Sequence, residues 1–190
     1  MAKKTVATLQ TGGGKDYIKC IKAVKNKKKQ GYALDLGCGA GVDSKYLAKN
    51  GFKVIAVDNS SDAIKQAKKT CKELSVKVVK ADIVNFKIEP DKYSLIISWN
   101  TLPFLRKKEA KKVLESIKKG LKKEGLFIFS IFGENDDWKD KKQMSFWNLE
   151  EFKKKMKGVE FVELIEKQKK DSSATGQVKF WHLIQGVIKK

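Results

Sequence analysis

The chain has 190 residues, of which 41% are hydrophobic and 34% are charged. This length suits one domain with a sizeable core, and the composition excludes a disordered or fibrous protein. The longest apolar stretch, residues 126–132, is far too short to cross a bilayer, and the N-terminus has no apolar block of the kind found in signal peptides. We therefore expect a cytoplasmic protein that has no membrane partner.

The net charge of +20 suggests an anionic partner such as nucleic acid. However, all but one of the 42 basic residues are lysines, and Arg106 is the exception. Nucleic-acid sites usually include arginine, whose planar side chain grips phosphates and bases with two hydrogen bonds. Because the lysines are spread along the whole chain, we interpret them as a solvated surface and keep a polyanion site as the alternative.

The three cysteines, Cys20, Cys38 and Cys71, are widely spaced and form no CxxC pair. This arrangement indicates neither a disulfide framework nor a metal site, so no bound metal is expected. Thiols of this kind suit a reducing compartment.

Strand and helix patterns alternate along the chain. A helix at 15–29 follows a glycine-rich joint. A later helix begins at Asn148, where Glu151 is placed to complete a capping box, and it ends at Gly158. Between them the apolar spacing predicts strands at 32–37, 52–58, 76–83, 93–99 and 125–132, separated by helices at 42–50, from Ser60 or Ser61 onward, and at 107–119.

Two more strands, at 160–168 and 178–188, have no helix between them and should pair antiparallel. The whole pattern predicts an α/β fold: a doubly wound, mostly parallel, seven-stranded sheet with an antiparallel last strand and helices on both faces. In such sheets ligands bind beyond the carboxyl ends of the strands, where the direction of winding reverses. The first strand leads directly into a glycine loop at 37–41, so we expect the ligand there.

This glycine loop, GCGAG, differs from the common phosphate-binding loops. It is not a triphosphate loop, and Val42 stands where a dinucleotide loop has glycine or alanine. Asp35, just before the loop, would repel a diphosphate but suits a positively charged amino-acid head. Asp58 ends the second strand and is placed for a ribose diol, while Asp82 follows the third and could accept from an adenine amine. An ammonium, a ribose and an adenine without a phosphate describe S-adenosylmethionine.

Four stretches, ALDLGCGAG, AVDNSSDAI, KADI and ISWNTLPFL, resemble the successive cofactor motifs of the class I, Rossmann-like S-adenosylmethionine-dependent methyltransferases. The resemblance implies that the acid before the loop approaches the methionine ammonium and that the residues after the fourth strand lie near the sulfonium. The cofactor-binding residues that it implies are Asp35, Gly37, Cys38, Gly39, Gly41, Asp58, Asn59, Asp82, Ile83, Trp99 and Asn100.

Two further stretches, FGENDDW at 132–138 and KFWH at 179–182, resemble motifs of small bacterial methyltransferases related to the tellurite-resistance enzymes, although Phe180 replaces a histidine of that subgroup. The first follows a parallel strand and the second begins an antiparallel one. We therefore expect both at the same edge of the sheet, beside the methyl group. The only histidine of the chain lies in the second stretch and is a candidate base. The candidate catalytic residues are Asp136, Trp138 and His182.

These inferences predict a methyltransferase that converts S-adenosylmethionine to S-adenosylhomocysteine and acts on a small-molecule acceptor such as a thiol, an amine or a metalloid anion. A base is needed only if the acceptor must lose a proton. The alternatives are a nucleic-acid methyltransferase, which the charge favours, and a cofactor-binding regulator. We expect one domain, 1–190, with an N-terminal segment and helix at 1–30, a cofactor-binding core at 31–132 and an acceptor side at 133–190, present as a monomer or weak homodimer.

Overall fold

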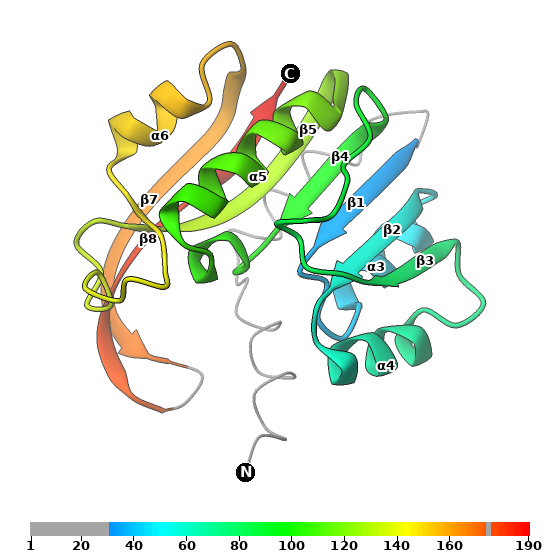
Figure 1. Cartoon of the computed structure of the whole chain (residues 1–190), viewed down its shortest axis with the longest axis horizontal. Helices are drawn as coiled ribbons and strands as arrows, with labels where there is room; N and C mark the ends of the chain where they lie inside the picture. The colour runs from blue at the N-terminus through cyan, green and yellow to red at the C-terminus, as the bar shows by residue number, and fades with distance from the viewer. Residues whose placement is uncertain (1–30, 174–175) are drawn as a thin grey trace.

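The structure is a computed structural model that describes residues 31–173 and 176–190. The predicted helix at 15–29 lies outside these residues. Within them, eight strands form one sheet (Figure 1). No helix in the described ranges is long and apolar enough to span a membrane. In chain order the elements are β1 (Tyr32–Leu36), α3 (Val42–Lys49), β2 (Lys53–Asp58), α4 (Ser61–Thr70), β3 (Val76–Lys80), β4 (Tyr93–Ser98), η2 (Leu102–Phe104), α5 (Lys107–Gly120), β5 (Leu121–Gly133), β6 (Phe146–Trp147), α6 (Leu149–Lys155), β7 (Glu160–Ser172) and β8 (Val178–Lys189).

The strands lie in the order β3-β2-β1-β4-β5-β8-β7, and β6 pairs with β5 at the side. Strands β1 to β5 all run parallel to one another. Strand β8 runs antiparallel to both of its neighbours, β5 and β7. The predicted sheet with an antiparallel last strand is confirmed. The sequence does not predict β6, because two residues are too few for an alternating pattern to be recognised.

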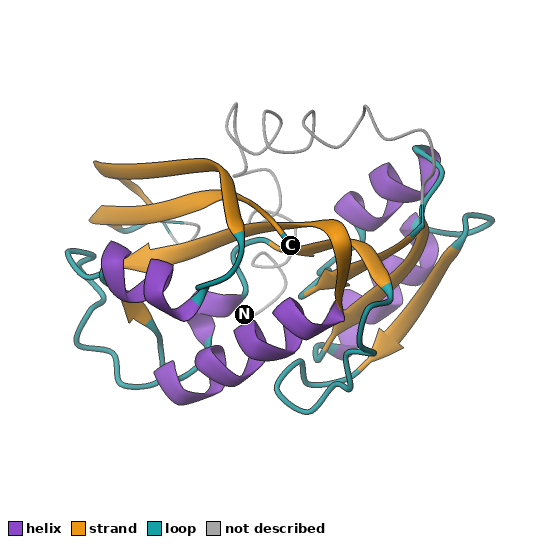
Figure 2. Ribbon diagram, turned by 90° about the horizontal axis from the view of Figure 1, so that it is seen from above, coloured by secondary structure: helices purple, strands orange, loops and turns teal. Residues whose placement is uncertain are grey.

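Helices cover both faces of the sheet, with α5 and α6 on one face and α3 and α4 on the other (Figure 2). Successive strand residues point to opposite faces, as the period of two requires. In β1, Leu34 packs into the core under α5, while its neighbour Ala33 packs into the core with Leu47 of α3. The parallel strands are therefore buried on both sides, which explains their almost continuous apolar sequence.

Several element boundaries differ from the prediction. Strand β5 begins at Leu121 rather than at 125, and α6 ends at Lys155 rather than at Gly158. Hydrogen bonds explain the ends of β3 and β7. Strand β3 ends at Lys80 rather than at 83. The Asp82 carboxylate accepts from the Val84 backbone N–H at 2.9 Å and turns the chain out of the sheet. Strand β7 continues to Ser172, past the predicted end at 168, because β8 pairs with it along its whole length.

The helix α6 begins where the sequence predicts, but the predicted capping box is wrong. The Asn148 side chain accepts from the Glu150 backbone N–H at 2.9 Å. The Glu151 carboxylate instead pairs with Lys107 at 2.6 Å and with Lys111 at 2.9 Å. This acid therefore joins α6 to α5 rather than closing its own helix.

The winding direction reverses between β1 and β4. These strands are neighbours, yet β1 leads by way of α3 to β2 on one side, and β4 leads by way of α5 to β5 on the other. Such a switch point leaves a crevice at the carboxyl ends of the strands. The glycine loop at 37–41 leaves β1 at this point.

Candidate cofactor and acceptor site

A cavity of about 380 Å³ opens at the carboxyl ends of β1, β2 and β4. Small-molecule sites typically have volumes of about 300–1,000 Å³. Most of the predicted cofactor-binding residues line this cavity: Gly37, Gly39, Asp58, Asn59, Asp82, Ile83, Trp99 and Asn100.

The glycine loop owes its shape to left-handed backbone and to close neighbours. Gly37 has φ 77°, and a Cβ there would lie 2.0 Å from the Thr101 hydroxyl oxygen. Cys38 and Gly41 do not line the cavity. Cys38 packs into the sheet core, and a Cβ at Gly41 would lie 3.1 Å from Ala67 of α4. These two residues therefore pack the loop against the sheet core and α4, and neither lines the cavity.

The carboxylate of Asp58 is held rigidly at the cavity. Its Oδ2 accepts from the Gly39 backbone N–H, and its Oδ1 accepts from the Ser60 backbone N–H, both at 2.9 Å. A carboxylate oxygen can accept more than one hydrogen bond, so each retains capacity toward the cavity. Two oxygens fixed in this way suit a pair of adjacent hydroxyls.

Asp35 lies beneath the glycine loop rather than in the cavity wall. Its side chain is only 2% exposed, and its Oδ2 accepts from the Ser44 hydroxyl at 2.6 Å. Burial, reinforced by the nearby charge of Asp43, raises the pKa of Asp35 to about 7. Asp35 is not among the residues that line the cavity, and its predicted role toward an ammonium stays a prediction.

The remaining walls come from the segments after β3 and β4. Ile83 is buried beside Asp82 and supplies an apolar surface. Asn100 has φ 51°, and its Oδ1 accepts from the Ser130 hydroxyl at 3.1 Å, which fixes the orientation of the amide. The Asp82 carboxylate, the apolar side chain of Ile83 and the oriented amide of Asn100 therefore line the same cavity.

Sequence analysis did not select five further lining residues: Ser60, Ala63, Thr101, Phe104 and Leu105. Thr101 follows closely on β4, so the strand-end rule could have identified it, whereas Phe104 ends η2 and Leu105 follows that helix. Ser60 caps α4, with its hydroxyl accepting from the Ala63 N–H at 3.3 Å. Phe104 is 46% exposed at the rim of the cavity.

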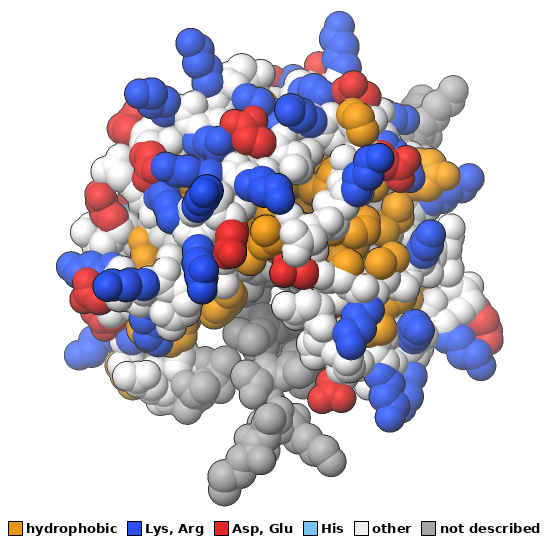
Figure 3. All heavy atoms as spheres, viewed as in Figure 1, with side chains coloured by type: hydrophobic (Ala, Val, Ile, Leu, Met, Phe, Trp, Pro, Cys, Tyr) orange, Lys and Arg blue, Asp and Glu red, His pale blue; other side chains and the backbone are white. Residues whose placement is uncertain are grey.

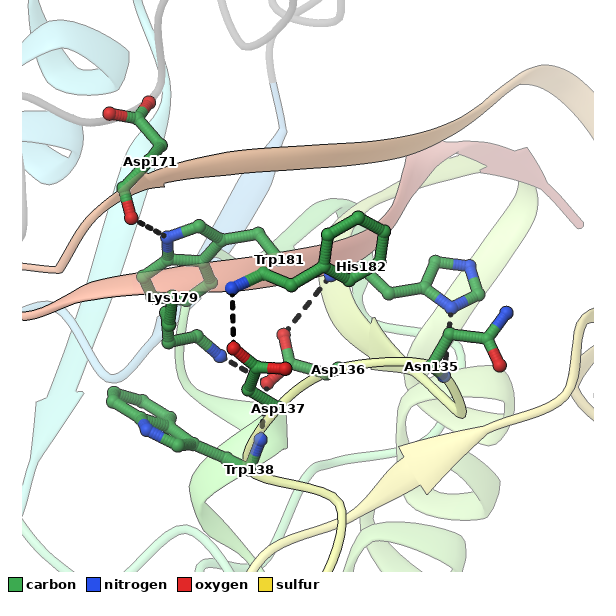
Figure 4. A network of polar contacts seen from close by, with 9 residues as sticks. Asn135, Asp136, Asp137, Trp138, Asp171, Lys179, Trp181 and His182 are labelled. Atoms are coloured by element: carbon green, nitrogen blue, oxygen red, sulfur yellow. Dashed lines mark hydrogen bonds and ion pairs between the residues drawn. The ribbon is translucent and has the colours of Figure 1, made fainter.

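A second cluster lies at the same edge of the sheet, where the loop after β5 meets the start of β8 (Figure 4). Three rings, Phe132, Trp138 and Trp181, form an aromatic box. Their centroids are 5.4 Å apart for the two indoles, and Phe132 lies 5.6 Å from Trp181 and 6.2 Å from Trp138. Phe132 also lies 6.0 Å from Phe104 at the cavity rim, so the aromatic box adjoins the cavity.

Both ring nitrogens of His182 are engaged within the fold. Its Nδ1 accepts from the Asn135 backbone N–H at 3.1 Å, which leaves the proton on Nε2. That nitrogen donates to Glu166 Oε1 at 2.7 Å. His182 is buried, with its ring against Gly133, and does not line the cavity. In this geometry both ring nitrogens are engaged in hydrogen bonds, so the structure does not favour the predicted role of His182 as a base, which stays a prediction.

Asp136 is also committed to the fold. It is fully buried and pairs with the Lys179 ammonium. It accepts in addition from the backbone N–H groups of Trp138, at 3.0 Å, and His182, at 3.1 Å (Figure 4). The carboxylate therefore organises the cluster, and of the three candidate catalytic residues only Trp138, which is half-buried, presents surface.

Comparison with known proteins agrees with the fold and the cavity. Residues 33–125 match the family described as methyltransferase domain, and residues 2–35 match a domain of unknown function, DUF4295. The carboxy-S-adenosyl-L-methionine synthase of Sulfurimonas denitrificans is 32% identical over 113 residues, covering 57% of this chain and 47% of that protein. The chain thus spans about half the length of this curated relative.

Two solved structures show the same fold. TehB from Haemophilus influenzae gives a TM-score of 0.76 at 20% identity, over 90% of this chain and 61% of that chain. Phospholethanolamine N-methyltransferase 2 of Haemonchus contortus, in complex with phosphomonomethylethanolamine and S-adenosylhomocysteine, gives 0.71 at 17% identity, over 94% and 53%. At these identities the likeness concerns the fold alone.

Residues 33–125 match the methyltransferase-domain family, and the strand order and the cavity at the switch point agree with a Rossmann-like methyltransferase fold. The cofactor predicted from the glycine loop and the acidic residues is the cofactor of that family.

Proposed function

We propose that this protein binds S-adenosylmethionine in the cavity and transfers the methyl group to a small nucleophile that needs no general base. The observation that carries the proposal is the Asp58 carboxylate, held by two backbone amides beside the glycine loop. It meets a ribose diol with two acceptors already oriented. Without the two carboxylate oxygens of Asp58, the ribose hydroxyls of a bound nucleoside would lack hydrogen-bond partners.

The other lining residues fit the remaining parts of the cofactor. Asp82 and Ile83 offer an acceptor and an apolar wall to an adenine. Trp99 and Asn100, beside the glycine loop, would surround the methionine part. When bound, S-adenosylmethionine supplies a methyl group on a sulfonium, so that transfer discharges the positive charge. The protein has to hold the acceptor about 3–3.5 Å from the methyl carbon, in line with the sulfur, and to exclude water.

The acceptor side favours nucleophiles that react without losing a proton. Phe104, Leu105 and the adjoining aromatic box provide an apolar wall. Both nitrogens of His182 are occupied, and Asp136 is ion-paired. A thiolate or a metalloid anion is nucleophilic as it stands, whereas an ammonium must first be deprotonated. The resemblance of FGENDDW to the tellurite-resistance enzymes is consistent with such an acceptor.

The nucleic-acid alternative has no support from the comparisons. Lysines are spread over the visible face with acidic side chains among them, rather than gathered into one stripe (Figure 3). Several are paired, such as Lys155 with Glu115 at 2.6 Å and Lys107 with Glu151. We propose that the charge is a solvated surface and that residues 31–190 work as one unit.

The test is transfer of labelled methyl from S-adenosylmethionine to matched pools: small thiols, selenite or tellurite, primary amines and total RNA. We expect label in the thiol or metalloid pool and little in the amines. Label that appears chiefly in RNA, and persists at physiological salt, would overturn the small-molecule proposal. Failure to bind S-adenosylhomocysteine in calorimetry would overturn the cofactor assignment itself.

A further inference from the structure

The aromatic box already contains a cation that belongs to the protein. The ammonium of Lys179 lies 3.9 Å from the centroid of Trp181, 4.0 Å from that of Trp138 and 5.3 Å from that of Phe132. Aromatic boxes of this kind bind ammonium groups by cation–π attraction, which is strongest when the cation is desolvated. Lys179 is only 2% exposed, so this condition is met.

The charge of this ammonium is retained because Asp136 balances it. The Asp136 carboxylate is 0% exposed, pairs with Lys179 and accepts two backbone N–H groups. Burial lowers the pKa of Lys179, and the bond to Asp136 opposes that shift. The pair ties the start of β8 to the loop after β5, and both indoles of the aromatic box stand on these two segments. Loss of either charge would leave the other buried without compensation.

The aromatic box is close to where an acceptor would lie. Phe104 lines the cavity and contacts Phe132, and Phe132 contacts both indoles. A second lysine, Lys141, has its ammonium 4.0 Å from the centroid of Trp138. The indole surfaces that could attract a cationic acceptor are therefore already in contact with lysines. A further positive charge beside them would also be repelled.

We propose that Lys179 is a positioning residue that holds Trp138 and Trp181 as the acceptor wall and, by occupying the aromatic box, excludes acceptors that carry positive charge. This inference rests on the proposed function and narrows its acceptor class to neutral or anionic nucleophiles. It separates this chain from amine methylation, which a similar aromatic box without an internal lysine would suit.

The first test uses three thiols that share one nucleophile and differ in charge: 3-mercaptopropionate, 2-mercaptoethanol and cysteamine. After correction for the thiolate fraction, wild-type kcat/KM for cysteamine should be lower than for 2-mercaptoethanol by about tenfold or more, as expected for a like charge close by. Lys179→Met should narrow this gap, while Lys141→Met, which removes the more exposed lysine, should leave most of it. Equal use of all three thiols by the wild type would overturn the proposal.

The second test does not depend on turnover. Lys179→Ala removes a group equivalent to propylammonium, and this variant should bind propylammonium but not the uncharged 1-propanol in calorimetry, whereas the wild type should bind neither. Equal binding of both would mean that only space matters, and would overturn the proposal.

If Lys179→Ala does not fold, the double variant Lys179→Met/Asp136→Asn removes both buried charges at nearly constant volume. It should fold and lose the discrimination against cysteamine, and retained discrimination would overturn the proposal.

The two sets of results separate the hypotheses. If no thiol or metalloid is methylated but Lys179→Ala binds propylammonium selectively, the proposed function fails and the ammonium-binding box stands. If the thiols are methylated without regard to charge, the proposed function stands and the role of Lys179 fails.

Discussion

The carboxylate of Asp58, at the end of β2, accepts a hydrogen bond from the backbone N–H of Gly39, in the loop after β1, at 2.9 Å. This bond links the ends of two neighbouring parallel strands and fixes the glycine loop at the wall of the cavity. One side chain therefore serves the fold and the proposed cofactor site together.

Asp58→Ala should weaken S-adenosylhomocysteine binding by roughly 1–3 kcal/mol, because the ribose hydroxyls and the Gly39 N–H lose their partner. Asp58→Asn should lose less, since the amide oxygen can still accept one of these bonds. Calorimetry measures both changes. Asp62→Ala provides the matched control, because Asp62 is an exposed acid of the next helix that does not line the cavity. Unchanged affinity in Asp58→Ala would remove Asp58 from the site.

The raised pKa of Asp35 predicts that the free energy of unfolding depends on pH. Its pKa is raised from 3.8 to about 7 in the folded chain, chiefly by burial. Between these two values the folded state binds more protons than the unfolded state, so the free energy of unfolding should fall as pH rises from about 4 to about 7 and stay low above that. Asp35→Asn should flatten this slope and raise stability above pH 7, by at most about 4 kcal/mol.

Urea unfolding of the unliganded protein at pH 5, 6, 7 and 8 measures the effect of Asp35. Asp62→Asn is again the control, because an exposed acid should leave the slope unchanged. A wild-type slope that survives in Asp35→Asn would show that another group titrates in this window.

Much of the candidate cofactor site is predictable from sequence, because many of its residues stand at or just after the carboxyl end of a strand. Asp58, Trp99 and Asn100 are reached by counting to the end of an apolar run and applying the rule for parallel sheets. The same rule would also have selected Thr101. The position of Asp35 is harder to predict, because one residue of strand register decides whether a side chain faces the cavity or the interior.

The acceptor side is less predictable because its contacts join distant segments. The two partners of His182 are the Asn135 backbone, 47 positions away, and Glu166, 16 positions away. Which groups meet it depends on the pairing of β8 with β5 and β7. The sequence indicates that a histidine lies near this edge, but a free imidazole and a fully bonded one look identical in it.

The backbone at Gly37 leaves no room for a larger side chain in the glycine loop. A Cβ there would lie 2.0 Å from the Thr101 hydroxyl oxygen, and the backbone has φ 77°. Gly37→Ala should therefore lower both stability and cofactor affinity, through strain of about 1–2 kcal/mol in the backbone and a collision in addition. Thermal unfolding and calorimetry measure the two effects.

Gly158→Ala separates the two causes of that loss. Gly158 has φ 89°, but a Cβ there would meet no atom within 4 Å. This variant should show the backbone strain alone and leave cofactor affinity intact. If Gly37→Ala and Gly158→Ala lose the same stability and neither affects binding, the close contact with Thr101 has no role in shaping the site.

His182 should prove structural rather than catalytic. His182→Ala removes the acceptor of the Asn135 N–H and the donor to Glu166, and it opens a space beside Gly133. The lost hydrogen bonds and the space left by the buried ring predict a loss of about 1–3 kcal/mol in the free energy of unfolding. His182→Gln, whose amide can both accept and donate, should recover part of it.

Since neither ring nitrogen has a free lone pair, turnover of a thiol should change little in His182→Gln. The pH–rate profile should follow the ionisation of the thiol in both proteins. A loss of turnover of about a hundredfold or more in His182→Gln, at unchanged stability and cofactor affinity, would restore His182 as a base.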